Sequence, residues 1–271
     1  MKKQAKSDVI SIIGMVVGAL LIVGALAYLG YIMWQYHLGK AEYRDLQELV
    51  FDRNADNGSD KGTGAKSSNG NQTDVEDSAM WAVDAAKVQQ ALGELKEQNS
   101  DIVGWIAFEN MELSYPIMWC GDDEYYLRHT FSGEINSSGS IFMEANNQPD
   151  FEDYHTIIYG HNMRNLSMFG RLKNYKTKDF YEGNEYFVIY TENSVYRYRI
   201  FSYYDISEES DVYTVGFGPD ENYRNFVNKM LKRSYYDTGV EVTEQDKIIT
   251  LSTCSTEGNR FVVHAKRVDE L

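Results

Sequence analysis

An almost uninterrupted apolar run at residues 9–34 is the feature that most limits how this chain can fold. It is about 26 residues long, or about 39 Å as an α-helix, which exceeds the ~30 Å hydrocarbon core of a bilayer. A cleaved signal peptide has a shorter apolar segment and a cleavage site of small residues, and neither is present. Tyr28, Tyr31, Trp34 and Tyr36 form an aromatic end suited to a membrane interface. The run therefore predicts one uncleaved transmembrane helix.

Charges near the N-terminus indicate how that helix is oriented. Lys2, Lys3 and Lys6 precede the apolar run, and positive residues favour the cytoplasmic side of a membrane. The N-terminus is therefore expected in the cytoplasm, and everything after Tyr36 is expected outside the cell. The predicted localisation is the cell membrane, with a single span and an extracellular domain.

Composition divides the rest of the chain. Residues 53–77 are rich in Asn, Gly, Ser, Asp and Lys, and they hold almost no large apolar side chain to offset the entropy of ordering. This predicts a flexible linker. The predicted organisation is a cytoplasmic tail at 1–8, a transmembrane anchor at 9–34, a juxtamembrane segment and flexible linker at 35–77, and one folded domain at 78–271.

Overall charge and cysteine content exclude several classes of function. The formal net charge is −15, from 26 basic and 41 acidic residues, so no basic surface is available for nucleic acid or for anionic lipid. The chain has no CxxC or HExxH pattern, so we expect no zinc site and no cofactor. Its two cysteines, Cys120 and Cys254, could form a disulfide in an exported protein, which is one alternative to a reactive thiol.

The folded domain is predicted to be mainly β. Val88, Leu92 and Leu95 follow helical spacing near its start, and a second helix is expected at residues 222–234. Short β-prone runs separated by turn residues fill most of the remainder, at 102–108, 113–118, 139–143, 156–159, 186–190, 195–202, 247–252 and 260–266. Eight such runs favour a closed, mostly antiparallel barrel.

Three side chains are candidates for catalysis. Cys254 ends one β-prone run, His161 follows the apolar run 157–159 through a Gly-His turn, and Arg260 begins the last run. A thiol on a loop between strands is held by rigid elements yet reaches solvent. Together the three side chains supply a nucleophile, a base and a cation for a developing oxyanion.

Other roles remain open for some of these residue types. A lone cysteine is usually an inert core residue, and Cys120 matches nothing catalytic. His264 competes with His161 as the base, because it shares a face with Arg260 if their strand is regular. Arg267 is the alternative to Arg260 as the cation.

Five sequence motifs, taken together, resemble the class B sortases, membrane-anchored cysteine transpeptidases of Gram-positive bacteria. The motifs are LKEQNSDIVGWI at 95–106, GSIFME at 139–144, YGHNM at 159–163, TLSTC at 250–254 and RFVVHAK at 260–266. The signature of that family is a TLxTC strand end with an earlier His and a later Arg. The resemblance covers roughly residues 80–271.

The resemblance implies a fold, a reaction and partners. The fold is an eight-stranded sortase-type barrel with an N-terminal helix and a further helix between the sixth and seventh strands. Cys254 attacks a threonine carbonyl in a C-terminal sorting signal, NPQTN-like or xPxTG-like, and a thioacyl-enzyme forms. His161 moves the protons, Arg260 stabilises the oxyanion, and an amine of a peptidoglycan precursor accepts the exported protein. Asn136, Ser252 and Thr253 are the implied substrate contacts.

Three alternatives to wall anchoring follow from the same residues. A pilin lysine could be the accepting amine. A papain-type or wall-peptidase hydrolase would place its cysteine before its histidine, which is the reverse of the order here. A catalytically silent anchored binding module would not need all three residue types.

Overall fold

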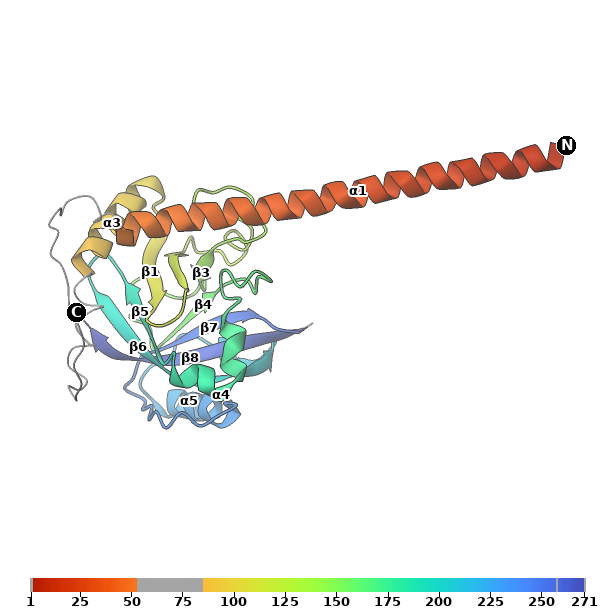
Figure 1. The fold of residues 1–271 in the computed structure, drawn as a ribbon. Helices are drawn as coiled ribbons and strands as arrows, with labels where there is room; N and C mark the ends of the chain where they lie inside the picture. The colour runs from red at the N-terminus through yellow and green to blue at the C-terminus, as the bar shows by residue number, and fades with distance from the viewer. Residues whose placement is uncertain (1, 53–84, 257, 271) are drawn as a thin grey trace, which may run out of the picture.

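The computed structural model describes residues 2–52, 85–256 and 258–270. Figure 1 shows a long helix projecting from a rounded β domain. The helices are α1 (Lys2–Gln47), α3 (Ala85–Gln98), α4 (Lys178–Glu182) and α5 (Glu221–Arg233), with short helical turns at Glu48–Asp52, Leu172–Lys176 and Asp211–Tyr213. The predicted flexible linker lies outside the described residues.

The described chain contains eight strands that close into a barrel in the order β1-β2-β3-β4-β7-β8-β6-β5. They are β1 (Ile102–Phe108), β2 (Ser114–Met118), β3 (Ile141–Met143), β4 (His155–Tyr159), β5 (Tyr186–Tyr190), β6 (Val195–Ser207), β7 (Ile248–Cys254) and β8 (Asn259–Glu270). Neighbouring strands are antiparallel except for the parallel pairs β2–β3 and β4–β7. The prediction of a closed, mostly antiparallel, eight-stranded barrel is confirmed.

Strands β6 and β8 run further than their sequence patterns indicated. The predicted runs ended at 202 and 266, whereas the strands continue to Ser207 and Glu270. The two strands pair along nearly their whole length, from Tyr196 opposite Glu270 to Ser207 opposite Asn259. Hydrogen bonding to a neighbour thus continues each strand beyond the part of the sequence with an alternating pattern.

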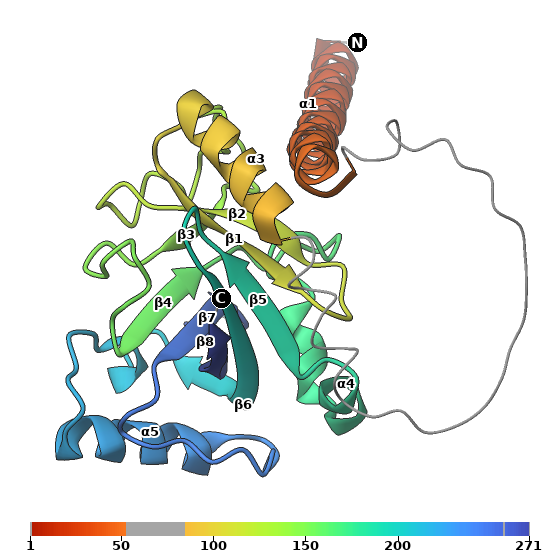
Figure 2. The same ribbon diagram turned by 90° about the vertical axis from the view of Figure 1, so that its left-hand side faces the viewer.

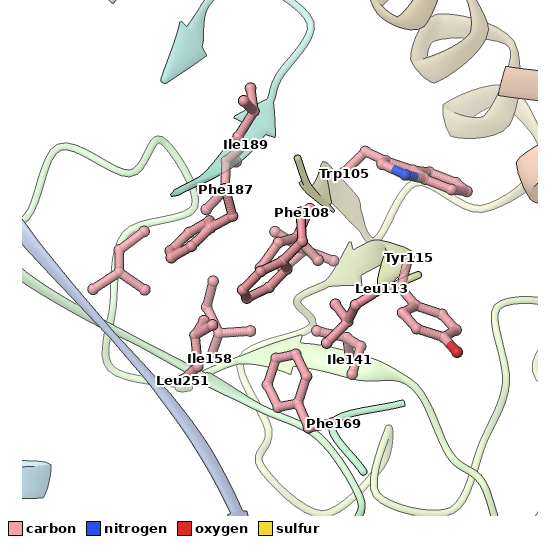
Figure 3. Close-up of a cluster of buried hydrophobic side chains, with 14 of the residues drawn as sticks. Trp105, Phe108, Leu113, Tyr115, Ile141, Ile158, Phe169, Phe187, Ile189 and Leu251 are labelled. Atoms are coloured by element: carbon pink, nitrogen blue, oxygen red, sulfur yellow. The ribbon is translucent and has the colours of Figure 1, made fainter. Parts of the chain in front are cut away.

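Large apolar side chains pack inside the barrel and between its sheet and the helices that cover it, as Figure 3 shows. The labelled members of this cluster come from most of the strands and are Trp105, Phe108, Leu113, Tyr115, Ile141, Ile158, Phe169, Phe187, Ile189 and Leu251. A second apolar cluster lies between the outer face of the sheet and α5, and includes Phe201, Phe226 and Val262. Alternate residues of β8 therefore face the barrel interior and α5.

Helices α3 and α5 lie on opposite sides of the barrel (Figure 2). Helix α3 buries Val88, Leu92 and Leu95, which confirms the helix expected near the start of the domain. Helix α5 lies between β6 and β7, and Asp220 caps it by accepting a hydrogen bond from the Tyr223 N–H at 3.0 Å. The helix predicted at 222–234 is therefore confirmed within a residue at each end.

Helix α1 is the one helix of the described chain that is long and apolar enough to cross a membrane. Its C-terminal part lies against the barrel, where Tyr43 and Leu46 join the core and the Tyr43 hydroxyl donates to the Gly139 carbonyl at 2.6 Å. A Cβ added at Gly39 would lie 2.7 Å from the Ser138 hydroxyl, so glycine permits this close approach. Part of the predicted juxtamembrane segment thus packs on the folded domain.

Candidate active site

The register of three neighbouring strands brings the candidate residues together. Strands β4 and β7 are parallel with Tyr159 opposite Ser252, and His161 and Cys254 each lie two residues further on. Strand β8 is antiparallel to β7 with Arg260 opposite Cys254. Residues distant in sequence therefore meet at one end of the barrel, in the order base, thiol, cation across the sheet.

Gly160 makes the turn before His161 possible. Its N–H donates to the Ser252 carbonyl at 3.1 Å, which extends the β4–β7 ladder by one bond. A Cβ at this position would lie 2.4 Å from the Ile141 side chain and 2.7 Å from the Phe169 ring. Since such contacts are too short for any side chain, only glycine lets the chain turn here against the core.

A backbone carbonyl fixes the tautomer of His161. Its Nε2 lies 2.7 Å from the Leu127 carbonyl oxygen, which can only accept a hydrogen bond. Nε2 therefore carries a proton, and Nδ1 is the nitrogen left free to gain or lose one. Leu127 belongs to the long connection between β2 and β3, so this connection helps to position the imidazole.

Cys254 is a free and exposed thiol at the last residue of β7. Its carbonyl accepts a hydrogen bond from the Asn162 side-chain amide at 2.7 Å, which ties the end of β7 to the turn that carries His161. Cys120 is also free, so the alternative of a disulfide between the two cysteines does not hold in this structure.

Arg260 reaches toward the end of β6. Its guanidinium lies 2.9 Å from the Glu208 carboxylate, and the two side chains are 34% and 49% exposed. The contact engages one terminal nitrogen, which leaves other donors of the planar fork available.

A cleft of about 190 Å³ joins the three candidates. It is lined by Asp123, Leu127, Phe142, Tyr159, Gly160, His161, Ser252, Thr253, Cys254 and Arg260. A larger cavity of about 630 Å³ contains Cys120 but neither a histidine nor an arginine. Only the smaller cleft therefore combines a thiol with a base and a cation. No group of metal-ligating side chains is present among the described residues.

The implied substrate contacts divide into two groups. Ser252 and Thr253 line the cleft, and the Thr253 hydroxyl is buried without a hydrogen-bond partner among the described residues. Asn136 is 5% exposed and lies elsewhere, where its amide donates to the Gln35 carbonyl of α1 at 3.0 Å. The structure brings Ser252 and Thr253 to the cleft and directs Asn136 to the helix contact instead.

His264 and Arg267, the alternatives for the base and the cation, lie away from the cleft. His264 is fully buried opposite Thr250, four residues along β7 from Cys254. Arg267 stacks 3.8 Å from the Tyr196 ring centre and pairs with Glu152 at 3.0 Å. Both residues are engaged in holding the fold.

Sequence reasoning missed several residues of this site. Tyr213 hydrogen-bonds the Ser252 hydroxyl at 3.0 Å, and burial raises the pKa of its phenol. Asp123 accepts a 2.7 Å hydrogen bond from the Ala145 N–H, and burial, together with the Glu144 carboxyl, raises its pKa. Both come from irregular connections without a motif. Asn162 had a signal, since it follows the Gly-His turn directly.

Comparison with known proteins agrees with this geometry. Residues 106–268 match the sortase domain family. The chain is 35% identical to sortase B of Listeria monocytogenes over 209 residues, covering 73% of this chain and 85% of that protein. It is 33% identical to sortase B of Staphylococcus aureus over 176 residues, covering 64% of this chain and 72% of that one.

The closed barrel is also that of solved sortases. A structure described as a Staphylococcus aureus sortase B–substrate complex superimposes with a TM-score of 0.71 at 26% identity, covering 87% of this chain and 99% of that one. The fold and the cysteine-containing cleft define a cysteine transpeptidase. The chain belongs to the sortase family, within class B.

Proposed function

We propose that this sortase cleaves a C-terminal sorting signal after threonine and transfers the exported protein to an amine of a peptidoglycan precursor. The observation that carries the proposal is the alignment of His161, Cys254 and Arg260 across β4, β7 and β8 in one cleft. A free exposed thiol, a histidine with one free nitrogen and a guanidinium are the groups that acyl transfer through a thioester requires.

The first half-reaction forms the thioacyl-enzyme. Nδ1 of His161 takes the proton of the Cys254 thiol as the sulfur attacks the threonine carbonyl carbon, and the carbonyl oxygen takes up negative charge. Collapse of this intermediate breaks the C–N bond, and the departing amine takes a proton from His161. Because Nε2 is held by the Leu127 carbonyl, Nδ1 is the nitrogen that exchanges this proton.

The second half-reaction reverses these roles. His161 removes a proton from the incoming amine as its nitrogen attacks the thioester, and the sulfur of Cys254 leaves and regains that proton from His161. Arg260 donates to the oxyanion in both half-reactions, because both pass through a tetrahedral intermediate at the same carbon. Ser252 and Thr253 line the cleft and are the proposed contacts for the signal peptide.

The membrane helix is part of the proposed function. Helix α1 is proposed to hold the enzyme at the outer surface of the cell membrane, with Lys2, Lys3 and Lys6 inside. A recognition site for a specific protease, inserted between residues 64 and 65, tests this orientation. Protease added to intact protoplasts should cut the chain into two fragments, seen after denaturation. Cutting only after the membrane is opened would contradict the orientation.

Fragment size, rather than release of the domain, is the appropriate readout for that experiment. Tyr43 and Leu46 of α1 pack in the same core as the barrel, so a cut chain can remain associated with the membrane until it is denatured.

The activity is tested with peptides and amines. The full chain in detergent is incubated with quenched fluorescent peptides carrying NPQTN-like or xPxTG-like signals, with and without an added amine. Cleavage together with a new amide to that amine is expected. Cleavage that yields only the free acid, whatever the amine, would instead support a cysteine hydrolase.

Wall anchoring and pilin polymerisation differ only in the amine. Peptidoglycan-precursor peptides and a lysine-containing pilin segment are therefore compared as acceptors at equal concentration. Faster transfer to the precursor is expected, and faster transfer to the lysine segment would favour a pilin-polymerising sortase.

A further inference from the structure

The end of β6 contacts the hairpin that joins β7 to β8. Glu208, the first residue after β6, pairs with Arg260 at 2.9 Å, and its N–H donates to the Gly258 carbonyl at 3.3 Å. Three residues earlier, Asp205 accepts a hydrogen bond from the Ser255 hydroxyl. Ser255 directly follows Cys254, so both sides of the hairpin are held from the same strand.

We propose that Glu208 is a positioning residue that orients the Arg260 guanidinium toward the reacting carbonyl. The inference rests on the proposed role of Arg260 as the oxyanion donor. Glu208 itself does not line the cleft, so it acts through Arg260.

Strand register explains why Glu208 can do this. Ile206 of β6 lies opposite Arg260 of β8, and Arg260 lies opposite Cys254 of β7. The backbone at Arg260 is thus fixed between the end of β6 and the nucleophile. Its side chain is not fixed by the sheet, because an arginine stem has several rotatable bonds. A carboxylate two residues beyond Ile206 supplies the missing constraint.

The contact leaves the guanidinium able to act. Glu208 engages one terminal nitrogen, whereas the planar fork has five N–H donors. Among the described residues, Glu208 is the one ion-pair partner of Arg260. If the guanidinium is already oriented before the substrate binds, less conformational entropy is lost on reaching the transition state.

A role in stability is an inadequate explanation for this pair. Arg260 and Glu208 are 34% and 49% exposed, and ion pairs this exposed add little to folding. Asp205 differs, because it accepts hydrogen bonds from Ser255, Lys176 and Tyr235. Burial opposes ionisation of Asp205, but these donors outweigh it and lower its pKa. Asp205 therefore anchors the fold, and Glu208 is the better probe of positioning.

The experiment compares Glu208→Ala with Glu209→Ala in the full chain in detergent. Both changes remove one exposed carboxylate, but no ion pair joins Glu209 to Arg260. Glu208→Ala should lower kcat about tenfold, the scale of leaving one long side chain unfixed, with KM and the thermal midpoint unchanged. Glu209→Ala should leave kcat unchanged. Equal kcat for the two variants would overturn the proposal, as would a faster Glu208→Ala enzyme.

A conservative variant separates orientation from charge. Glu208→Gln keeps the side-chain length and an oxygen that can face the Arg260 guanidinium, and it removes the negative charge. Its kcat should stay within about twofold of the unaltered enzyme if orientation matters, since most of the ordering remains. A Gln variant as slow as the Ala variant would refute positioning by contact with this oxygen.

A double-mutant cycle ties the effect to Arg260. Removing Glu208 from an Arg260→Ala enzyme should change kcat no further, because there is no guanidinium left to orient. An additional tenfold loss would overturn the proposal. If Arg260→Ala alone has normal kcat, the proposed role of Arg260 fails. A slow Arg260→Ala enzyme with a normal Glu208→Ala enzyme would refute only the inference about Glu208.

Discussion

Polar side chains in two parts of strand β7 differ in exposure and in hydrogen bonding. At the C-terminal end, Cys254 is exposed and the Thr253 hydroxyl has no hydrogen-bond partner among the described residues. Further back on the strand, Thr250 is fully buried and bonded on both sides. It lies 2.7 Å from Nε2 of His155 and 2.8 Å from Nδ1 of His264.

Hydrogen-bond geometry at the buried end favours the neutral form of His155, and burial favours the neutral form of His264. His155 Nδ1 lies 2.7 Å from the Thr214 carbonyl and must carry a proton, so its Nε2 accepts from the Thr250 hydroxyl. That hydroxyl then accepts from Nδ1–H of His264. A hydroxyl has one proton, so adding another to His155 would disrupt the chain. The buried end is thus specialised for stability, and the cleft end for reaction.

The largest expected effect is at the cleft end. Cys254→Ala removes the proposed nucleophile from an exposed position, so it should abolish peptide cleavage and leave the thermal midpoint nearly unchanged. Cleavage is measured with the fluorescent peptides, and the thioacyl-enzyme is sought by intact mass.

Cys120→Ala is the matched control. Burial and the neighbouring Asp101, Asp122 and Asp123 carboxylates raise the pKa of the Cys120 thiol, which makes it a poor nucleophile at neutral pH. This variant should keep full activity. Cleavage by Cys254→Ala that disappears when Cys120 is also replaced would show that the nucleophile had been misassigned.

A smaller effect is expected at Arg260. If the planar fork spans the oxyanion and a neighbouring carbonyl, Arg260→Lys should lose about 10²-fold in kcat, on the scale of one oxyanion donor. Arg260→Ala should lose at least as much. Both losses should fall on kcat, because the oxyanion exists only during reaction. A Lys variant with near-normal kcat would show that charge alone is enough.

Much of the cleft end could be predicted from sequence because its signals are local. The TLSTC strand end, the Gly-His turn and Arg260 each lie within or beside a β-prone run. The three candidate residues lie close together because β4, β7 and β8 are neighbours in the barrel. The three candidate catalytic residues followed from motifs, whereas their catalytic roles stay proposals.

The contacts that complete the site could not be predicted, because they come from non-local partners. Leu127 lies in a connection without a motif, yet its carbonyl fixes His161. Glu208 reaches Arg260 only because β6 runs past residue 202, where the predicted run ended. Asn136 was an implied substrate contact, but its burial against α1 depends on a helix about a hundred residues away in sequence.

The smallest change in activity is expected from changes to the buried histidines. Lowering the pH should instead reduce the free energy of unfolding through these two residues. Burial lowers the pKa of His155 from its ordinary 6.5 to about 4, and burial also lowers that of His264, with His155 and Arg233 adding in the same direction. Above pH 6.5 both histidines are neutral in the folded and unfolded chains. Between pH 6.5 and about 4 the unfolded chain binds protons that the folded chain does not. The free energy of unfolding therefore decreases as the pH is lowered through this range.

The expected loss from His155 alone is about 3 kcal/mol across that window. It is measured as the urea midpoint of the full chain in detergent from pH 7 to pH 4, following near-ultraviolet circular dichroism.

His264→Phe should flatten this decline, because it removes one buried titrating ring beside the Tyr204 aromatic ring. His129→Gln, which removes a half-buried histidine that does not contact β7, should leave the decline unchanged. If His129→Gln flattened it as much as His264→Phe, the acid sensitivity would not reside at the buried end of β7. Kinetics at pH 7 should be normal in both variants, since neither ring lines the cleft and both buried histidines are already neutral there.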